Sequence, residues 1–370
     1  MAIDATPVLG RPTGVGSFVL GLTERLALDP DLSLSAYALS LRNSQLLSDY
    51  LAPSVTCSAT PMPAALLSRV WARFDGPVIE RWMGTIDVVH GTNFVVPPTR
   101  RAAALVTVHD LAMVLRRDLC SGSSLQYASL VRRAIERGAH VHTPTRTIAA
   151  EVVSVLGADA DRVHVVNHGL ADAPTGPGSD AGVGRALAGS NRYVVAVGTV
   201  EPRKDYPTLI RAFDLVAATD PDLHLVVAGS PGWGMEAFTK AQESAAYTQR
   251  IRHLGWVDDI ARAAVIRGAA ALVFPSIYEG FGFPPLEAMK EAVPVVTTRD
   301  PAIMEVVGDA ALLVDVGNAE ELAKAINTVL QDESLRAQLT VAGHRRVEAF
   351  TWERAATEMA SVYSRVAAGG

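Results

Sequence analysis

The segment 270–292 constrains the fold more than any other part of the chain. An apolar run, 270–274, leads into a loop that contains two glycines, and the loop leads into Pro284-Pro285 and a helical sequence. Such a run is typical of a strand that is buried on both faces of a parallel sheet. Proline suits the first turn of a helix, because the N–H that it lacks would have no partner there. The segment therefore predicts a strand, a loop and a helix, the repeating unit of a parallel α/β sheet.

Two carboxylates flank this loop. Glu279 precedes it and Glu287 follows it, in the first turns of the expected helix. Gly280 and Gly282 allow a ligand to approach the backbone closely. The free N–H groups at the start of a helix favour an anion. The segment thus predicts a site in which two carboxylates bracket a ligand with hydroxyl groups, while the loop holds its phosphates.

A second segment carries adjacent cations at the end of an apolar strand. The run 193–200 leads into Glu-Pro-Arg203-Lys204 and then into a helix that begins near Thr208. Arginine clamps two phosphate oxygens, and lysine adds a point charge. Arg203 and Lys204 are therefore candidates to bind a diphosphate.

These two segments resemble the motifs of retaining glycosyltransferases of the GT-B fold, in the large family four. The Glu-x7-Glu pair has the family's flanks, Phe-Pro-Ser before it and Glu-Ala-Met within it, and Gly-Thr-x-Glu-Pro-Arg-Lys is similar to the family's diphosphate-binding turn. Asp205 departs from the usual asparagine. The resemblance implies two facing, doubly wound Rossmann-like domains around an interdomain cleft, where the carboxyl ends of the strands bind ligands.

The resemblance also implies roles for particular residues. Glu279 would hold the hydroxyls of the donor sugar, Glu287 those of the ribose, and His109 would contact the sugar from the other domain. The expected catalytic residues are Glu279, His109, Arg203 and Lys204. The expected donor-binding residues are Gly16, Gly198, Arg203, Lys204, Gly229, Val257, Glu279, Gly280, Phe281, Gly282, Phe283 and Glu287. Trp256, beside Val257, either meets the nucleobase or packs in the core.

Several first-half motifs leave two interpretations open. In Val-His109-Asp110-Leu, Asp110 either orients the histidine or caps the next segment. The turn His90-Gly-Thr-Asn93 either lines the acceptor side or is structural. The glycine-rich turn 11–17, which contains Gly16, is either a tight turn or a loop that approaches the diphosphate. Asn-His168-Gly predicts a hinge turn.

The order of predicted elements indicates two domains. Strands are expected near 86–90, 103–108, 140–143, 163–166, 193–199, 223–229, 270–275, 294–298 and 311–315. Helices are expected near 15–28, 63–82, 122–137, 145–156, 207–218, 235–250, 259–268, 285–292, 319–331 and 333–348. Residues 171–190 are rich in Gly, Pro and Ser and predict a linker. We therefore expect an acceptor-side domain over 1–170, a donor domain over 191–349, and a terminal helix in 350–370 that crosses back to the first domain.

Composition excludes several classes of protein. The net charge of −6 is more acidic than a nucleic-acid binder normally carries. Residues 1–7 lack the basic and apolar regions of a signal peptide, so no secretory signal is expected. There is no run of 18 apolar residues, and the two cysteines have no metal-type spacing. These features predict a cytoplasmic protein. No Cys-x-x-Cys is present, and Arg203, Lys204 and helix N-termini offer the charge that a metal ion supplies elsewhere, so we expect catalysis without a metal or other cofactor.

The identity of the substrates is less constrained. The second half resembles bacterial mannosyltransferases of polysaccharide assembly, which favours GDP-mannose as donor, with UDP-glucose or another nucleotide sugar as the alternative. The acceptor is a glycan, a lipid-linked glycan or a small molecule. The segment that holds Trp71, Arg73, Phe74, Arg81 and Trp82 either contacts the inner face of the membrane or packs in the core.

Two other classes of protein share the predicted architecture. A nicotinamide-dependent oxidoreductase would require Gly-x-Gly-x-x-Gly, but Val19 occupies the third glycine position after Gly14 and Gly16. A silent relative that acts as a binding subunit is the other alternative. The oligomeric state is not predicted.

Overall fold

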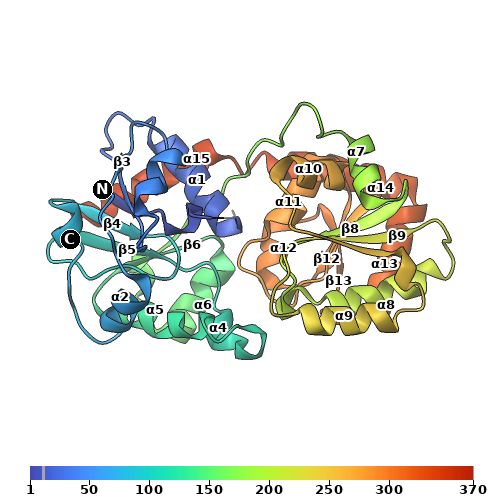
Figure 1. Ribbon diagram of the computed structural model, residues 1–370, viewed down its shortest axis with the longest axis horizontal. Helices are drawn as coiled ribbons and strands as arrows, with labels where there is room; N and C mark the ends of the chain where they lie inside the picture. The colour runs from blue at the N-terminus through green and yellow to red at the C-terminus, as the bar shows by residue number, and fades with distance from the viewer. Residues whose placement is uncertain (11–12, 370) are drawn as a thin grey trace. The chain divides into compact units, whose positions relative to one another are not determined.

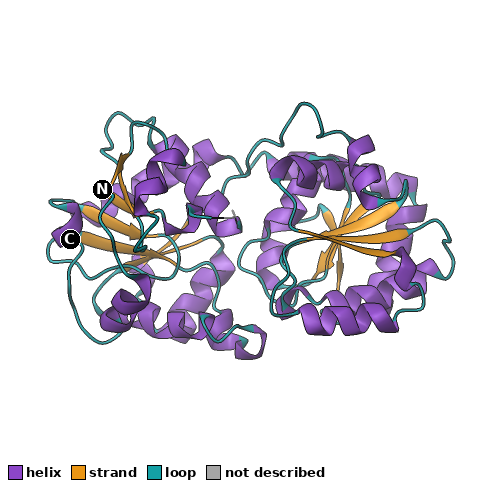
Figure 2. Ribbon diagram, viewed as in Figure 1, coloured by secondary structure: helices purple, strands orange, loops and turns teal. Residues whose placement is uncertain are grey.

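The chain folds into two compact units. The computed structural model describes residues 1–10 and 13–369. One unit contains the described residues of 1–117 and 122–171 together with those from Phe350 onward, and the other contains 118–121 and 172–349. Each unit is a parallel sheet with helices on both faces (Figures 1 and 2). The doubly wound α/β class predicted from the sequence is confirmed.

The first unit is built on a seven-stranded sheet. Its strands lie in the order β3 (Thr56–Cys57), β2 (Ser35–Tyr37), β1 (Ala2–Asp4), β4 (Val88–Gly91), β5 (Ala103–Thr107), β6 (His140–Thr143) and β7 (Val163–Val165). The order reverses between β1 and β4. The α-helices among its described residues are α1 (Gly14–Leu26), α2 (Ala64–Trp71), α3 (Glu80–Met83), α4 (Ala112–Leu115), α5 (Tyr127–Glu136), α6 (Arg146–Leu156) and α15 (Trp352–Ala368).

The second unit has a six-stranded sheet. Its order is β10 (Ile251–Gly255), β9 (His224–Ala228), β8 (Tyr193–Val197), β11 (Ala271–Phe274), β12 (Val295–Thr298) and β13 (Ala311–Val314). Here the order reverses between β8 and β11. The α-helices are α7 (Ala181–Ala188), α8 (Tyr206–Ala217), α9 (Met235–Ser244), α10 (Asp259–Arg267), α11 (Phe283–Lys290), α12 (Pro301–Val307), α13 (Ala319–Gln331) and α14 (Glu333–Val347).

The sheets are buried on both faces, as the apolar runs predict. Every residue of β8 and β11 is buried, and the side chains from α8 and α13 complete one apolar core of the second unit. In the first unit α1 and α15 pack together on one face, with α2, α5 and α6 on the other (Figure 1). The carboxyl ends of parallel strands lie at one edge of a sheet, so each unit presents a single edge for a site.

Two predicted segments differ from the structure. The helix expected over 63–82 is interrupted between α2 and α3, at Gly76-Pro77, where proline supplies no backbone N–H. Trp71 is fully buried, and its Nε1–H donates to the Pro77 carbonyl at 3.0 Å. Trp71 is therefore a core residue, and the membrane-facing alternative is wrong for this side chain.

The predicted linker 171–190 contains helix α7. Asp180 caps it by accepting from the backbone N–H groups of Gly182 and Val183, at 2.8 and 3.1 Å. A Cβ atom at Gly184 would lie 1.9 Å from the carbonyl oxygen of Ala264 in α10. Gly184, one of the glycines that made this segment resemble a linker, instead allows α7 and α10 to pack closely.

Candidate active site

The candidate site of the second unit lies where its strand order reverses. β8 and β11 are neighbours, with β9 and β10 beyond β8, and β12 and β13 beyond β11. Arg203 and Lys204 follow β8 in a short 3-10 helix, and Glu279 follows β11. Ligands of open α/β sheets bind at such a switch point. The structure therefore brings the two sequence motifs to one place.

Glu279 joins the two motifs through a pair of short ion pairs. Its Oε2 accepts from Arg203 Nη1 at 2.6 Å, and its Oε1 accepts from Lys204 Nζ at 2.6 Å. Arg203 Nε also donates to Glu201 Oε2 at 2.7 Å. The side chains of Glu279 and Lys204 are buried, with exposed fractions of 7% and 8%. The two cations are held side by side at the strand ends.

Burial and charge act in opposite directions on this cluster. Burial would raise the pKa of Glu279, but Arg203 and Lys204 outweigh it and lower that pKa to about 2. Burial lowers the pKa of Lys204, and Glu279 offsets part of this effect. The Lys204 ammonium also lies 4.4 Å from the centroid of the Phe274 ring, which favours a cation there. Glu279 is a carboxylate at any pH near neutrality.

Glycines let the backbone of neighbouring loops come close together at this edge. Gly198, directly after β8, has φ +145°. A Cβ at Gly229, after β9, would lie 1.9 Å from the Gly198 carbonyl oxygen. Gly282 has φ +93° and precedes Phe283, the first residue of α11. Of the two glycines in the loop 280–283, Gly282 thus has the left-handed backbone conformation that favours glycine.

Glu287 lies in α11 with one oxygen paired. Its Oε1 is 3.2 Å from Arg262 Nη2 of α10. Its Oε2 is buried and has no hydrogen-bond partner among the described residues. Burial raises the pKa of Glu287, and Arg262 offsets part of the rise. A buried carboxylate oxygen without a donor is a place where a ligand hydroxyl would bind.

The end of β10 adds a partly exposed aromatic side chain. Trp256 is 43% exposed, so the core-packing interpretation is wrong. Val257 follows it and is half-buried. The backbone N–H of Gly229 donates to the Gly255 carbonyl at 2.8 Å, and His253 Nε2 donates to the Gly229 carbonyl at 2.8 Å. These bonds fix the ends of β9 and β10 next to each other.

Gly16 and His109 belong to the first unit. Gly16 is buried in the first turn of α1, while Arg11 and Pro12 of the predicted turn lie outside the described residues. His109 follows β5, and its Nε2 donates to the Thr92 carbonyl at 2.8 Å. Burial lowers the pKa of His109 to about 4, so the ring is neutral at pH 7. With Nε2 protonated, Nδ1 is a hydrogen-bond acceptor.

Contacts bear on three first-half motifs. Asp110 Oδ1 accepts from Ala112 N at 2.9 Å, as expected of the interpretation in which it caps the following segment. His90 is fully buried between Tyr363 and Thr107, so it is structural. Asn167 donates to the Pro144 carbonyl at 2.7 Å, as expected of turn chemistry.

Four residues of the site region were not predicted from the sequence. Glu201 orients Arg203, Phe274 lies beneath Lys204, Arg262 pairs with Glu287, and Asp300 has a pKa raised by burial and by the charge of Glu279. Glu201 and Phe274 stand inside the quoted motifs and could have been proposed from them. Arg262 and Asp300 come from other elements, and only the tertiary structure brings them near.

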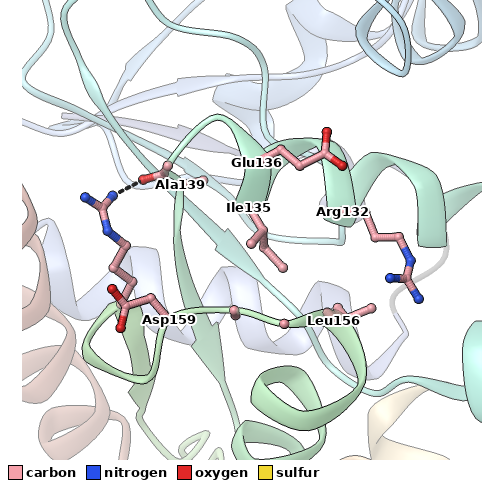
Figure 3. Close-up of a pocket in the computed structure, with 10 residues that line it drawn as sticks. Arg132, Ile135, Glu136, Ala139, Leu156 and Asp159 are labelled. Carbon is pink, nitrogen blue, oxygen red and sulfur yellow. Dashed lines mark hydrogen bonds between the residues drawn. The ribbon is translucent and has the colours of Figure 1, made fainter.

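One pocket lies away from all of these residues. Its volume is about 380 Å³, and Figure 3 shows its lining, which includes Arg132, Glu136, Ala139, Leu156 and Asp159. The Arg162 guanidinium donates to the Gly138 carbonyl beside it. Ala139 precedes β6 and Arg162 precedes β7, so the pocket lies at the amino edge of the first sheet. None of the predicted site residues lines it.

The described residues contain neither a cluster suited to a metal ion nor a helix that could span a membrane. Across residues 1–10 and 13–369, no group of three or more His, Cys, Asp or Glu side chains is arranged to hold a metal ion. Within the same part of the chain, every helix is too short or too polar to cross a bilayer.

The fold and the sequence can be compared with known proteins. The chain superposes on the Anabaena protein HepE, solved in complex with UDP-glucose, with a TM-score of 0.75 at 18% identity over 99% of this chain and 100% of that one. The architecture is the GT-B fold of glycosyltransferases. Residues 185–346 match the family described as "Glycosyl transferases group 1", and residues 13–169 match the family described as "Glycosyl transferase 4-like domain".

Curated relatives agree with this class. The chain is 28% identical to O-antigen chain mannosyltransferase B of Escherichia coli, over 75% of this chain and 74% of the relative. It is 32% identical to alpha-maltose-1-phosphate synthase of Mycolicibacterium smegmatis, over 67% of this chain and 68% of the relative. The chain belongs to the group 1 glycosyltransferases.

Proposed function

We propose that the chain is a retaining transferase that moves mannose from GDP-mannose to a hydroxyl group of a glycan, a lipid-linked glycan or a small molecule, without a metal ion. Its standing as a hexosyltransferase rests on the family and on the relatives named above. The nucleotide-sugar donor, the retained configuration and the reaction without a metal ion are proposed from the cluster of Arg203, Lys204 and Glu279 at the switch point. That cluster carries the proposal.

The cluster suits a nucleotide diphosphate. The Arg203 guanidinium and the Lys204 ammonium lie side by side at the strand ends, where both donate to Glu279. The proposed diphosphate lies on Arg203, Lys204 and the backbone of the loop 280–283. These groups are fixed before the substrate arrives, so they stabilise the charge of the leaving phosphate without reorganising. Two cations in this position supply the charge that a metal ion supplies elsewhere.

Glu287 and Glu279 take different hydroxyl groups in this proposal. The unpartnered Oε2 of Glu287 would accept from the ribose. Glu279 would accept from the donor sugar while it keeps its two cations. His109, neutral and with Nδ1 as an acceptor, would contact the sugar from the first unit. Gly16, Gly198, Gly229 and Val257 would contribute close backbone approach.

The state of Glu279 supports a same-face reaction. A carboxylate with a pKa of about 2, held by two cations, is a weak base and a weak nucleophile. A double displacement that uses Glu279 is therefore disfavoured. In the proposed step the acceptor oxygen bonds to the anomeric carbon as the bond to the phosphate oxygen breaks. The leaving phosphate takes the acceptor proton, and the configuration is retained.

A lipid-linked acceptor would place the first unit at the inner face of the cell membrane. Leu66 and Phe74 are 59% and 63% exposed, and Arg69 and Arg73 are exposed between them. Exposed apolar side chains beside arginines suit an anionic bilayer surface. Binding to vesicles with and without anionic lipid tests this part of the proposal.

Calorimetry with GDP, UDP, ADP and dTDP, first in EDTA and then with Mg²⁺, tests the donor assignment. We expect GDP to bind selectively and without metal. Replacing Arg203 and Lys204 together by Ala removes two charge-assisted contacts of about 1.5–3 kcal/mol each, so binding should weaken at least about 100-fold. Arg345→Ala, at an exposed position, is the matched control and should bind as the wild type does.

The alternative outcomes are distinct. Selectivity for UDP would move the donor to UDP-glucose, the sugar nucleotide bound in the Anabaena structure. Binding by the double variant at wild-type strength would refute the diphosphate assignment. No binding of any nucleotide by the wild type would favour a silent binding subunit.

A further inference from the structure

The loops that follow β8 and β9 remain paired beyond the ends of the two strands. Val200 N donates to the Ser230 carbonyl at 3.0 Å, and Gly234 N donates to the Val200 carbonyl at 2.9 Å. A Cβ at Gly234 would lie 2.9 Å from the backbone carbonyl carbon of Glu201. Since Glu201 binds Arg203, the loop after β9 rests directly on the turn that carries the cations of the site.

Two side chains from other elements hold the glycines at which these loops begin. Tyr206 Oη donates to the Gly198 carbonyl at 2.9 Å, and His253 Nε2 donates to the Gly229 carbonyl at 2.8 Å. A carbonyl oxygen only accepts, so the proton of each bond belongs to the side chain. The first residue after each strand is thus fixed by one polar atom.

Phe238 of α9 connects these two side chains. Its ring centroid lies 6.1 Å from that of Tyr206 and 5.3 Å from that of His253, at interplanar angles of 79° and 58°. Such edge-to-face and tilted contacts are favourable between aromatic rings. Tyr206 and Phe238 are buried, and their helices, α8 and α9, lie side by side on one face of the sheet (Figure 1). We call Tyr206, Phe238 and His253 the aromatic clamp.

The clamp stands beside a bulge in β10. The register of β10 against β9 shifts between His253 and Gly255, which leaves Leu254 as an extra residue. Gly255 has φ +71°, and its carbonyl accepts from Gly229 N at 2.8 Å. Gly229 is therefore bonded to β10 through both its N–H and its carbonyl. Bulges re-aim groups beside active sites, so this irregularity suits a site at the strand ends.

We propose that the three residues of the aromatic clamp are positioning residues for the donor nucleotide. By holding the Gly198 and Gly229 carbonyls they fix the two loops, and through the loops the turn that carries Arg203 and Lys204. The Lys204 stem borders the clamp, since a Cβ at Gly198 would lie 3.1 Å from Lys204 Cε and 3.4 Å from Tyr206 Oη. The clamp does not touch the substrate. Its effect on binding rests on the proposed function, whereas its effect on the loops does not.

Two matched Tyr→Phe variants separate positioning from stability. Tyr206→Phe removes one oxygen atom and keeps the ring. Tyr193→Phe is the control, because Tyr193 Oη also donates to a backbone carbonyl, that of Val265 at 2.6 Å, but Tyr193 begins β8 and lies at the opposite edge of the sheet. Each variant loses one hydrogen bond, so both should melt below the wild type by a similar amount. Only Tyr206→Phe should exchange the amides of residues 198–201 and 229–234 faster.

A pair of variants at His253 tests the other half of the clamp. Glutamine and leucine both remove the ring, but only glutamine keeps an N–H group for the Gly229 carbonyl. GDP should bind roughly tenfold more weakly to His253→Leu than to His253→Gln, because the nucleotide must then order a loop that one hydrogen bond ordered before. The same ratio is expected between Tyr206→Phe and Tyr193→Phe.

Calorimetry with GDP, or with UDP if the wild type selects it, measures these ratios. Wild-type exchange and binding in Tyr206→Phe would overturn the proposal, and so would equal binding by the two His253 variants. Faster exchange with unchanged binding would also overturn it, since the clamp would then stabilise the loops without positioning the nucleotide. If the wild type binds no nucleotide, the proposed function fails, and amide exchange, which requires no ligand, still decides whether the clamp holds the loops.

Discussion

At the scale of single residues, Glu279 is the structural centre of the site. A buried ion pair is weak evidence for stability, because the desolvation of both charges opposes their attraction. Here one carboxylate carries two cations, and both follow a strand at the carboxyl edge of the sheet, the edge at which open α/β sheets bind ligands. In the proposed function this arrangement holds two cations in place for an anionic substrate.

Glu279→Gln tests how strongly the cluster depends on that charge. The variant leaves Lys204 buried without its counter-charge, so the free energy of unfolding should fall by about 3–5 kcal/mol. Denaturant unfolding of the second unit, followed through amide exchange in β8 and β11, measures the change. Glu358→Gln removes an exposed pair with Arg354 and should change little. A loss no larger than that of the control would show that the cluster is solvent-screened.

The residues that could be predicted from the sequence are those that carry their own local signal. Arg203, Lys204, Glu279 and Glu287 stand in strand–loop–helix segments whose order fixes them at the carboxyl edge of a sheet. That Glu279 binds both cations was not predicted, because the sequence does not show which side chains pair across 75 residues. Asp300 carried no signal at all. Its position depends on the turn of α12 lying against the β11 loop.

At the scale of elements, long apolar strands and capped helices were predicted well. The bounds of α13 agree with the sequence, since Asn318 caps it and apolar positions recur along it. β1, β2 and β3 were not predicted, because each has only two or three residues and no alternation can be recognised in so few. Their place in the sheet comes from pairing with β4 and with one another.

Asp205 lies between the 3-10 helix Pro202–Lys204 and α8, at the position where the family usually has asparagine. Its φ is +45°, in the left-handed region, and its side chain accepts from Thr208 N at 3.3 Å to cap α8. Asparagine and aspartate both adopt this conformation more readily than other residues with a side chain, and both cap helices. The substitution is therefore compatible with the backbone conformation of the turn between Arg203 and α8.

The close approach of β8 and β9 predicts the effect of adding one methyl group. Gly229→Ala would place a Cβ 1.9 Å from the Gly198 carbonyl oxygen, and the contact is with backbone, which cannot rotate away. We expect a loss of about 1–3 kcal/mol of stability and weaker nucleotide binding, because Gly198 would move. Gly122→Ala, where a Cβ meets no atom within 4 Å, is the control. Unchanged calorimetry and melting in Gly229→Ala would contradict this account.

At the scale of the whole chain, the described residues at the C-terminus complete the first unit. Helix α15 contributes Trp352, whose ring lies against Gly21 of α1, and Tyr363. Tyr363 begins a row of hydrogen bonds through the buried interior. Tyr363 Oη lies 2.8 Å from His90 Nδ1, and His90 Nε2 lies 2.7 Å from Thr107 Oγ1. Thr107 Oγ1 in turn lies 2.9 Å from His142 Nδ1, and His142 Nε2 lies 3.0 Å from the Val166 carbonyl.

Chemistry fixes the direction of this row. The Val166 carbonyl only accepts, so His142 Nε2 carries a proton and Nδ1 accepts from the Thr107 hydroxyl. Thr107 then accepts from His90 Nε2, and His90 Nδ1 accepts from Tyr363. Burial holds the pKa of His142 at about 3 and that of His90 well below its usual value, so both rings are neutral. Protonation of either ring would turn its accepting nitrogen into a donor and so reverse the direction of one bond of the row.

The stability of the first unit should therefore depend on pH. His90, His109, His142 and His168 all have a pKa lowered by burial, while the unfolded value is about 6.5. Below pH 6.5 the unfolded chain binds protons that the folded unit does not, so stability is complete above that pH and falls as pH drops toward 4. Each histidine contributes at most about 1.4 kcal/mol per pH unit. Asp4 acts in the opposite sense, since burial raises its pKa to about 6.

Amide hydrogen exchange of β4, β5 and β6 at pH 7.5, 6.5 and 5.5, corrected for intrinsic rates, measures this dependence. His142→Gln keeps a donor for the Val166 carbonyl and removes one titrating ring, so its slope below pH 6.5 should be shallower than that of the wild type. His344→Gln, at an exposed position on α14, is the control and should keep the wild-type slope. Equal slopes in all three proteins would mean that His142 is not held neutral by the fold, and the directed row of hydrogen bonds would then be wrong.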